Sequence, residues 1–246
     1  MSFESSARQS AHPIMVALDV PSADEALGLA GRLEGVPVWM KVGMELFYAA
    51  GPDLVRRLKA QGHRIFLDLK FHDIPNTVRG AARSASRLGV DMFNVHAAGG
   101  SAMMRAALEG AGEGSEGGKL PIVIAVTQLT STSEETMRRE IGIDAPLADV
   151  VVRYASLAKD AGLHGVVSSA LEAAAVKAAC GADFVTVTPG IRPAGADVLD
   201  QARVMTPSAA LANGADYLVI GRPITGAPDP REALLRVIEE IASVRR

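Results

Sequence analysis

The sequence predicts a single (β/α)8 barrel, and three observations lead to this prediction. Eight short apolar runs, rich in Val, Ile and Phe, alternate along the chain with alanine-rich stretches of helical length. The runs are mostly continuous rather than alternating between apolar and polar residues, which is typical of parallel strands buried on both faces. The 246 residues suit eight strand–helix units in one domain, whereas a doubly wound sheet usually needs fewer strands.

The predicted strands are short segments that lie between a turn and a helical stretch. In a barrel each strand has one face toward the interior and one toward the surrounding helices, so both faces are expected to be apolar. The strands are expected at Ile14–Leu18, Val38–Val42, Ile65–Leu69, Met92–Val95, Ile122–Thr127, Gly165–Ser168, Phe184–Thr188 and Tyr217–Ile220.

Each strand is expected to be followed by a helix. The first helix has Ser22 as its N-cap and Glu25 three residues on, a capping-box spacing that satisfies two backbone N–H groups. The helices are expected at Ser22–Leu33, Asp53–Ala60, Pro75–Leu88, Ser101–Glu109, Pro146–Ala161, Leu171–Ala179, Pro207–Ala212 and Pro230–Val244.

Three connections are long, but none of them reads as a linker between domains. The glycine-rich stretch Gly110–Gly118 is expected to be a solvated loop. The connection Leu129–Asp144 contains a charged segment, Glu134–Glu140, that we expect to be helical. The irregular stretch Pro193–Val204 is long enough for a mobile lid.

Composition and charge argue against several classes of protein. The chain has 25 basic and 28 acidic residues, a formal charge of -3, and only one Trp, three Tyr and six Phe. A nucleic-acid binder would more often show a basic stripe with interleaved aromatic residues. No run approaches the ~18 apolar residues of a membrane span. We therefore expect neither a nucleic-acid partner nor a membrane-inserted segment.

The beginning of the chain and its single cysteine indicate where the protein works. Residues 1–12 are polar and small, without the apolar segment of a signal peptide, and are expected to be a flexible tail ahead of one barrel domain at 13–246. Cys180 has no second cysteine to pair with, which fits a reducing compartment. The expected location is the cytoplasm.

Charged residues stand where the first three predicted strands end, which is where barrels of this type carry their chemistry. Asp19 follows the first strand, Lys41 lies in the second, and the third leads into Asp68, Lys70 and Asp73. Asp68 and Lys70 are two residues apart, so on a strand both point toward the barrel mouth. Burying one charge alone costs roughly several kcal/mol, so these charges must be paired.

Two interpretations of this charged set remain open. Lys41, Asp68, Lys70 and Asp73 alternate in sign and could form a salt-bridge network that merely closes the barrel. Alternatively, the set holds a proton donor, because neighbouring carboxylates keep a lysine protonated and raise the energy of an anionic substrate group placed against them. The second arrangement suits a reaction that expels the charge of an anion and then needs a proton.

The seventh and eighth strands are followed by a different kind of residue. Thr188–Arg192 reads TPGIR and Gly221–Ile224 reads GRPI. Glycine permits close backbone approach, arginine offers a two-pronged donor, and the loops after strands seven and eight form the usual phosphate site of such barrels. Two ordinary turns with surface arginines are the other interpretation.

The run Asp68–Thr77, DLKFHDIPNT, resembles the signature of the orotidine 5'-phosphate decarboxylase family, cofactor-free barrel enzymes that form UMP and carbon dioxide. The D-x-K-x-x-D core alone is moderately specific, since related sugar-phosphate barrels have similar patterns. The remaining motifs resemble bacterial members in order and spacing, and together they make the match highly specific. They are ALDV at Ala17–Val20, KVG at Lys41–Gly43, NVHA at Asn94–Ala97, VTQLTS at Val126–Ser131, TPGIRP at Thr188–Pro193 and IGRPIT at Ile220–Thr225.

The resemblance implies a role for each matching residue. Lys70 would protonate C6 of the pyrimidine, Asp68 would sit beside the leaving carboxylate, and Asp73 would complete the charge array from a neighbouring subunit. Thr77 would also reach across that interface, so the implied assembly is a homodimer with shared sites. The residues implied to bind orotidine 5'-phosphate are Asp19 and Lys41 at the ribose, Thr130 and Pro189 near the base, and Arg192, Gln201, Gly221 and Arg222 at the phosphate.

The five histidines are expected to stay outside the chemistry. His72 lies inside the signature, but lysine is the better acid for a carbanion as basic as the one this reaction forms, so His72 is expected to be structural. His96 is expected to be a hydrogen-bonded wall residue at the end of the fourth strand. Surface or turn positions are expected for His12, His63 and His164.

Two alternatives to this function are kept. The first is a magnesium-dependent barrel that acts on a sugar phosphate as a decarboxylase or aldolase, with Glu45 and Asp68 as conceivable ligands. Lys41 and Lys70 would repel a divalent ion from the same mouth, so we expect no metal and no cofactor. The second alternative is a non-catalytic nucleotide-binding barrel.

Overall fold

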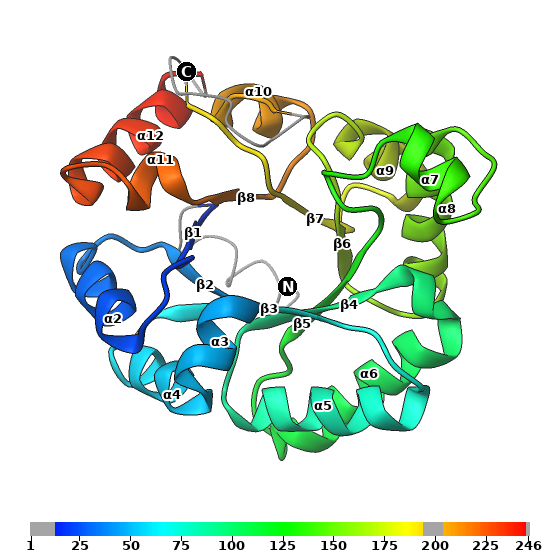
Figure 1. Cartoon of the computed structure of the whole chain (residues 1–246), viewed down its shortest axis with the longest axis horizontal. Helices are drawn as coiled ribbons and strands as arrows, with labels where there is room; N and C mark the ends of the chain where they lie inside the picture. Colours follow the sequence, from blue (N-terminus) through cyan, green and yellow to red (C-terminus); the bar gives the residue numbers. More distant parts are fainter. Residues whose placement is uncertain (1–12, 194–203, 245–246) are drawn as a thin grey trace.

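The computed structural model describes residues 13–193 and 204–244, which form a closed barrel of eight parallel strands. Each strand pairs with the next along the chain and β8 closes the ring on β1, as the sequence predicted. Figure 1 shows the helices arranged around the strands. The tail predicted at residues 1–12, and positions 194–203 of the predicted lid, lie outside the described residues.

The strands are three to eight residues long and most of their residues are buried on both faces. Their bounds are β1 Ile14–Ala17, β2 Trp39–Gly43, β3 Arg64–Phe71, β4 Met92–His96, β5 Ile122–Val126, β6 Gly165–Val167, β7 Val185–Thr188 and β8 Tyr217–Ile220.

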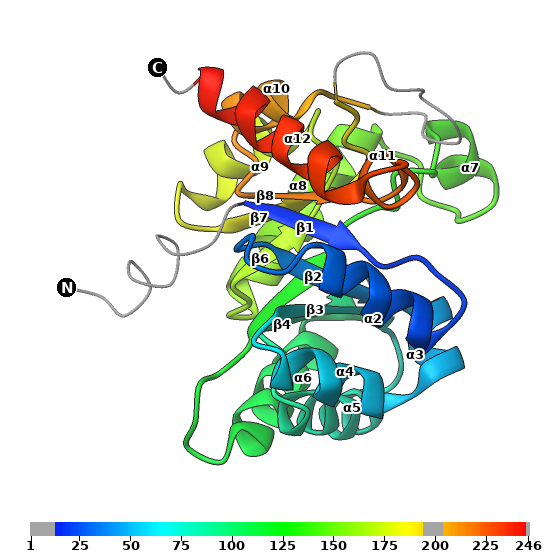
Figure 2. The ribbon, with the colours of Figure 1, turned by 90° about the vertical axis from the view of Figure 1, so that its left-hand side faces the viewer.

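Helices cover the outside of the barrel. In Figure 2, α10 and α12 lie on one side of the strands and α4, α5 and α6 on the other. None of the helices in the described part of the chain is long and apolar enough to cross a membrane. The helices are α2 Ala23–Arg32, α3 Met44–Ala50, α4 Pro52–Ala60, α5 Pro75–Arg87, η1 Ala97–Gly99 (a 3-10 turn), α6 Gly100–Ser115, α7 Glu134–Arg139, α8 Leu147–Asp160, α9 Ala173–Cys180, α10 Pro207–Ala212, α11 Arg222–Thr225 and α12 Pro230–Val244.

The sequence predicted every strand to within two residues at each end. Half of the expected capping box is present: the Ser22 hydroxyl accepts the backbone N–H of Glu25, but the Glu25 carboxylate accepts the Ser22 hydroxyl instead of a second backbone N–H. Two short helices, α3 and α11, were missed. Among the residues of α3 only Leu46 is buried, so this helix has no apolar stripe that a pattern could reveal. The four residues of α11 are too few for any periodic signal.

The loop predicted at Gly110–Gly118 was wrong, because α6 continues through it to Ser115. Gly110 and Gly114 are buried against α5, and a Cβ at either position would overlap a backbone carbonyl oxygen of that helix. The glycines therefore let two helices approach closely instead of interrupting one of them. Since their cost to the helix is about 1 kcal/mol each, this close packing is what offsets it.

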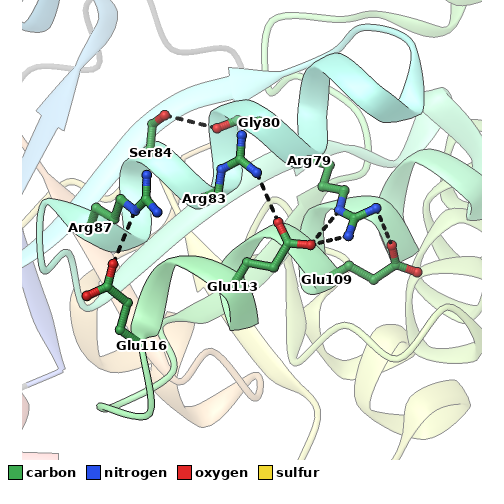
Figure 3. A network of polar contacts seen from close by, with 8 residues as sticks. All are labelled: Arg79, Gly80, Arg83, Ser84, Arg87, Glu109, Glu113 and Glu116. Carbon is green, nitrogen blue, oxygen red and sulfur yellow. Dashed lines mark hydrogen bonds and ion pairs between the residues drawn. The ribbon is translucent and has the colours of Figure 1, made fainter.

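Ion pairs join the exposed edges of α5 and α6 (Figure 3). Arg79 binds Glu113 through Nε at 2.8 Å, and Arg83 reaches the other oxygen of the same carboxylate at 3.3 Å. Arg87 and Glu116 add a pair at 3.5 Å. Pairs as exposed as these contribute little to stability, so the glycine contact rather than the charges holds the two helices together.

The barrel interior is apolar along most of the length of the strands and charged at their carboxyl ends. One buried cluster fills the interior, separately from the larger cluster between strands and helices, and includes Trp39 of β2 and Phe66 of β3. Lys41 and Asp68 each come two residues later on these strands, so they occupy the next interior layer toward the carboxyl ends. Figure 2 shows β1 pointing toward this end, where α3, α7 and α11 lie.

Candidate active site

Four charged side chains form one continuous network at the carboxyl ends of β1, β2 and β3. Nζ of Lys41 lies 3.0 Å from Oδ1 of Asp19 and 3.5 Å from Oδ2 of Asp68. Nζ of Lys70 lies 2.7 Å from Oδ1 of Asp68. Asp68 therefore stands between two ammonium groups, and the network carries two positive and two negative charges.

The environment keeps Asp68 ionised. Burial alone would raise the pKa of the Asp68 carboxyl, but the charges of Lys41 and Lys70 and hydrogen bonds from Lys70 and Asn94 outweigh it. The pKa consequently lies below its usual range, and Asp68 is a carboxylate at neutral pH. Gly43 leaves room for this array, because a Cβ there would come 3.1 Å from Nζ of Lys41.

Lys70 has a backbone conformation that non-glycine residues rarely adopt. Its φ is 52°, and among the described non-glycine residues only Glu116 shares a positive φ. Such a conformation costs roughly 1–3 kcal/mol and persists where the surroundings hold it in place. Strain of this kind is concentrated at functional sites, which makes Lys70 a candidate on backbone geometry as well as on charge.

Asn94 of β4 is hydrogen-bonded to two residues of this network, and it was not predicted as a site residue. It is 1% exposed, its Oδ1 accepts the backbone N–H of Lys70 at 2.8 Å, and its Nδ2 donates to Oδ1 of Asp68 at 2.7 Å. The signal was present in the sequence: Asn94 is a polar residue in the middle of an apolar strand, where an unsatisfied amide would be costly.

Asp73 lies outside the network, which differs from the four-residue set considered from the sequence. Its side chain is exposed and accepts the backbone N–H of Ile74 at 2.6 Å, and it forms no ion pair with any residue in 13–193 or 204–244. Asp19 is the second carboxylate of the network instead. Thr77, in the first turn of α5, is exposed as well.

Two arginines gather on the other side of the mouth, after β7 and β8. Arg192 is 8% exposed, its Nη1 donates to the carbonyl of Ile191 at 3.0 Å, and its buried Nε has no hydrogen-bond partner among residues 13–193 and 204–244. Burial lowers the pKa of the Arg192 guanidinium, and the charge of Arg222 lowers it further. Within the described ranges Arg192 forms no ion pair, so its guanidinium is a buried cation beside a second cation.

The remaining expected binding residues lie on loops at the same end of the barrel. Gly221 follows β8 and lies beside the network: a Cβ added at Gly221 would come 3.6 Å from Oδ2 of Asp19. Thr130, after β5, and Pro189, after β7, are both partly buried. Gln201 lies outside the described residues.

Two histidines stand beside Lys70. The rings of His72 and His96 lie 5.3 Å apart at 35°. Burial lowers the pKa of His96, and the nearby His72 and Lys70 lower it further, so His96 is neutral at pH 7. The hydrogen bond expected for His96 is absent among the residues described; the ring contact takes its place. His164, expected at a surface or turn position, lies in a bend before β6 and is partly buried, and its Nδ1 accepts the backbone N–H of Val123.

No group of three His, Cys, Asp or Glu side chains in the described part of the chain is placed to hold a metal ion. Asp68, the carboxylate proposed from the sequence as a conceivable ligand, has an ammonium group on each of its two oxygens. Its lone pairs are thus already directed at cations of this chain.

Comparison with known proteins agrees with this geometry. Residues 12–237 match the model of the family described as Orotidine 5'-phosphate decarboxylase / HUMPS family. The orotidine 5'-phosphate decarboxylases of Bacillus cereus and Bacillus mycoides are each 55% identical over 228 residues, which cover 92% of this chain and 96% of the relative.

Solved structures agree as well. A crystal structure of orotidine 5'-phosphate decarboxylase from Lactobacillus acidophilus superposes with a TM-score of 0.84 at 42% identity, covering 93% of this chain and 98% of that one. An uncharacterized conserved protein from Geobacillus kaustophilus gives a TM-score of 0.83 at 48% identity, covering 93% of this chain and 100% of that one. The chain therefore belongs to the orotidine 5'-phosphate decarboxylase / HUMPS family.

Proposed function

We propose that the chain converts orotidine 5'-phosphate to UMP and carbon dioxide, the last step in making UMP, without a cofactor. The observation that carries the proposal is the contact of 2.7 Å between Nζ of Lys70 and Oδ1 of Asp68, in a mouth whose other side holds Arg192 and Arg222. A proton donor, a fixed carboxylate and a phosphate-sized cationic site are the three parts that this reaction requires. The membership in the family supports the same conclusion.

Lys70 acts as acid and as electrostatic stabiliser. The bond between C6 of the pyrimidine and its carboxyl carbon breaks, the electron pair stays on C6, and carbon dioxide departs. An ammonium group already in place stabilises the developing carbanion and then transfers a proton to C6. The neutral lysine regains its proton from water. Asp68 holds the ammonium group of Lys70 through their contact of 2.7 Å before the reaction.

Asp68 also acts on the substrate carboxylate. Because its pKa is held below the usual range, it remains an anion beside the group that leaves. Two carboxylates in contact repel each other, and the repulsion disappears as carbon dioxide forms, so the interaction favours the transition state over the bound substrate. Binding energy from the distant phosphate holds the two anions together.

The other residues orient the nucleotide. Asp19 and Lys41 lie at the edge of the network, where they bind the ribose hydroxyls, and Thr130 and Pro189 lie near the base. Arg192 and Arg222, with Gln201 and Gly221, bind the phosphate, and the segment Pro193–Val204 closes over it. Charge-assisted hydrogen bonds from guanidinium to phosphate are among the strongest in proteins, so this end supplies the binding energy that the chemistry uses.

The active form is a homodimer with sites shared between the two copies. Asp73 and Thr77 are exposed and separate from the network in a single chain, yet both belong to the segment that follows Lys70. Between them Ile74 is 66% exposed, and Tyr48 of α3 is 76% exposed. Large exposed apolar side chains beside an unpaired carboxylate suit an isologous contact in which each copy lends Asp73 to the other.

Mixing two inactive variants tests the shared site. Lys70→Ala and Asp73→Asn should each be nearly inactive, and after unfolding and refolding together they should regain about a quarter of the wild-type turnover, because half of the dimers are mixed and each has one intact site. Orotidylate turnover and the mass in solution are measured on the same samples. A mixture no more active than its components would contradict the sharing.

An assay in the presence of a strong chelator separates the proposal from its first rival. We expect loss of orotidylate absorbance at an unchanged rate after treatment with EDTA, since Lys41 and Lys70 already neutralise the anions at the mouth. A magnesium-dependent sugar-phosphate enzyme would lose its activity and regain it with the metal. A non-catalytic nucleotide-binding barrel would bind UMP and consume no orotidylate at all.

The chain works in the cytoplasm according to this proposal. Cys180 is a buried free thiol, and burial raises its pKa. A thiol that stays protonated and covered is compatible with a reducing compartment, where biosynthesis of nucleotides takes place. Recovery of active protein from outside the cell, with the Cys180 thiol oxidised, would contradict the proposed cytoplasmic location.

A further inference from the structure

The pairing of β3 with β4 is interrupted at the segment that contains Asp68 and Lys70. Leu67 pairs with Phe93 and Phe71 pairs with Val95, so three residues of β3 stand opposite the single residue Asn94. A bulge of this kind leaves backbone groups without their ladder partners. Lys70 lies inside the bulge with its φ at 52°.

The side chain of Asn94 gives one of these backbone groups a partner and also binds a side chain of the bulge. Its Oδ1 accepts the backbone N–H of Lys70 at 2.8 Å, and its Nδ2 donates to Oδ1 of Asp68 at 2.7 Å. Only this orientation of the amide satisfies both partners, since an N–H must meet an oxygen and a carboxylate must meet a donor. With 1% of its surface exposed, Asn94 has no water to compete for these bonds.

The two bonds act on the same reacting unit. Oδ1 of Asp68 accepts both from Nδ2 of Asn94 and from Nζ of Lys70, so the amide fixes the carboxylate oxygen that orients the ammonium group. The other bond fixes the backbone from which that ammonium group extends. One buried amide thus constrains both ends of the Lys70 side chain.

We propose that Asn94 is a positioning residue for proton transfer: it holds Lys70 in its left-handed backbone conformation and Asp68 in its orientation, so that the ammonium group is in place before substrate binds. The role in catalysis rests on the proposed function. Asn94 itself touches neither the phosphate arginines nor the exposed segment around Asp73, so substrate affinity depends on it less than the chemical step does.

Replacing Asn94 with alanine tests the proposal. We expect Asn94→Ala to lower kcat for orotidylate by about 10²-fold, as displacements of about 1 Å do in active sites, while KM stays within about threefold of the wild type. The backbone amide of Lys70, followed by NMR in the unliganded protein, should exchange with solvent several-fold faster. An unchanged kcat, or an unchanged exchange rate at Lys70, would overturn the proposal.

A second variant separates the two bonds and covers the case that the first does not fold. Asn94→Asp keeps an oxygen for the N–H of Lys70 but puts a second carboxylate against Asp68. Its kcat should fall while the exchange of the Lys70 amide stays slow. A normal kcat in Asn94→Asp would show that the bond to Asp68 has no role in positioning, contrary to the proposal.

The matched control is another buried, doubly hydrogen-bonded residue on the barrel. Thr186 of β7 is fully buried, donates to the carbonyl of Gly214 at 2.8 Å and accepts the N–H of Asp216 at 3.1 Å. Thr186→Val should lower the melting temperature and leave kcat and KM unchanged. If it lowered kcat as Asn94→Ala does, loss of stability would explain both, and the positioning role would be refuted.

The proposed function and the positioning role of Asn94 would be refuted by different measurements. A wild-type chain that does not decarboxylate orotidylate refutes the proposed function, whatever the variants do. Amide exchange at Lys70 needs no substrate, so it still decides whether Asn94 holds the backbone of Lys70. A wild-type chain that is active, with Asn94→Ala equally active, refutes the role of Asn94 alone.

Discussion

Replacing Lys70 with alanine is expected to lower the turnover of orotidine 5'-phosphate by at least about 10⁴-fold, because one side chain supplies both the proton and the charge that stabilises the carbanion. Product binding should remain measurable. UMP has no carboxylate at C6, so its affinity depends on the ribose and phosphate contacts, which the substitution leaves in place. Initial rates from orotidylate absorbance and calorimetric titration with UMP give the two quantities.

The control for Lys70→Ala is a second lysine–aspartate pair at the opposite end of the barrel. Nζ of Lys59 lies 2.6 Å from Oδ2 of Asp91, and both residues are at least partly buried. Lys59→Ala removes an equivalent ion pair and should leave turnover within about threefold of the wild type. Near-normal turnover in Lys70→Ala would contradict the role of Lys70, whereas equal losses in the two variants would trace the effect to stability.

The charges of the site could be predicted from the sequence because charged residues lie within or directly after the apolar runs of the first three strands. Asp19, Lys41, Asp68 and Lys70 each follow or end a buried run, and parallel strands of a barrel bring those ends together. What could not be predicted is which partner each charge takes. Asp73 has the right spacing for the set, but the chain turns outward after the bulge and exposes it.

Local irregularities of the backbone are the other features that could not be predicted from the sequence. No periodic pattern in the sequence predicts the bulge in β3 or the positive φ of Lys70, since both accompany a hydrogen bond that the backbone N–H of Lys70 donates to Asn94 on the next strand. The glycines of α6 were misread for a related reason: Gly110 and Gly114 indicate a loop when considered locally and a close helix contact once α5 is in place. In each case a tertiary contact decides what the local residue means.

Electrostatics divide the mouth into a neutral half and a cationic half. Around Asp68 the charges of Lys41 and Lys70 are balanced by those of Asp19 and Asp68. On the other side, burial and the charge of Arg222 lower the pKa of the Arg192 guanidinium. Under the proposed function, a dianionic phosphate would remove the repulsion between the two arginines when it binds, so we expect affinity to originate in this half of the mouth.

Removal of one of these arginines is therefore expected to act on binding. Arg222→Ala should raise KM for orotidylate by about 10- to 100-fold, the equivalent of losing one charged hydrogen-bonded contact of roughly 1.5–3 kcal/mol. The loss should appear only with ligands that carry a phosphate: the affinity for UMP falls by the same factor, and the weak affinity for uridine stays unchanged. Arg236→Ala, which removes an exposed arginine paired with Glu232 on α12, should change neither affinity.

The comparison of UMP with uridine makes this prediction specific to the phosphate. If Arg222 instead bound the base or the ribose, Arg222→Ala would weaken both ligands equally, and if it served only the fold, the melting temperature would fall without a change in KM. Because binding energy from the phosphate is used in the chemical step, part of the loss should appear in kcat as well. An unchanged KM with an unchanged affinity for UMP would refute the assignment of Arg222 to the phosphate.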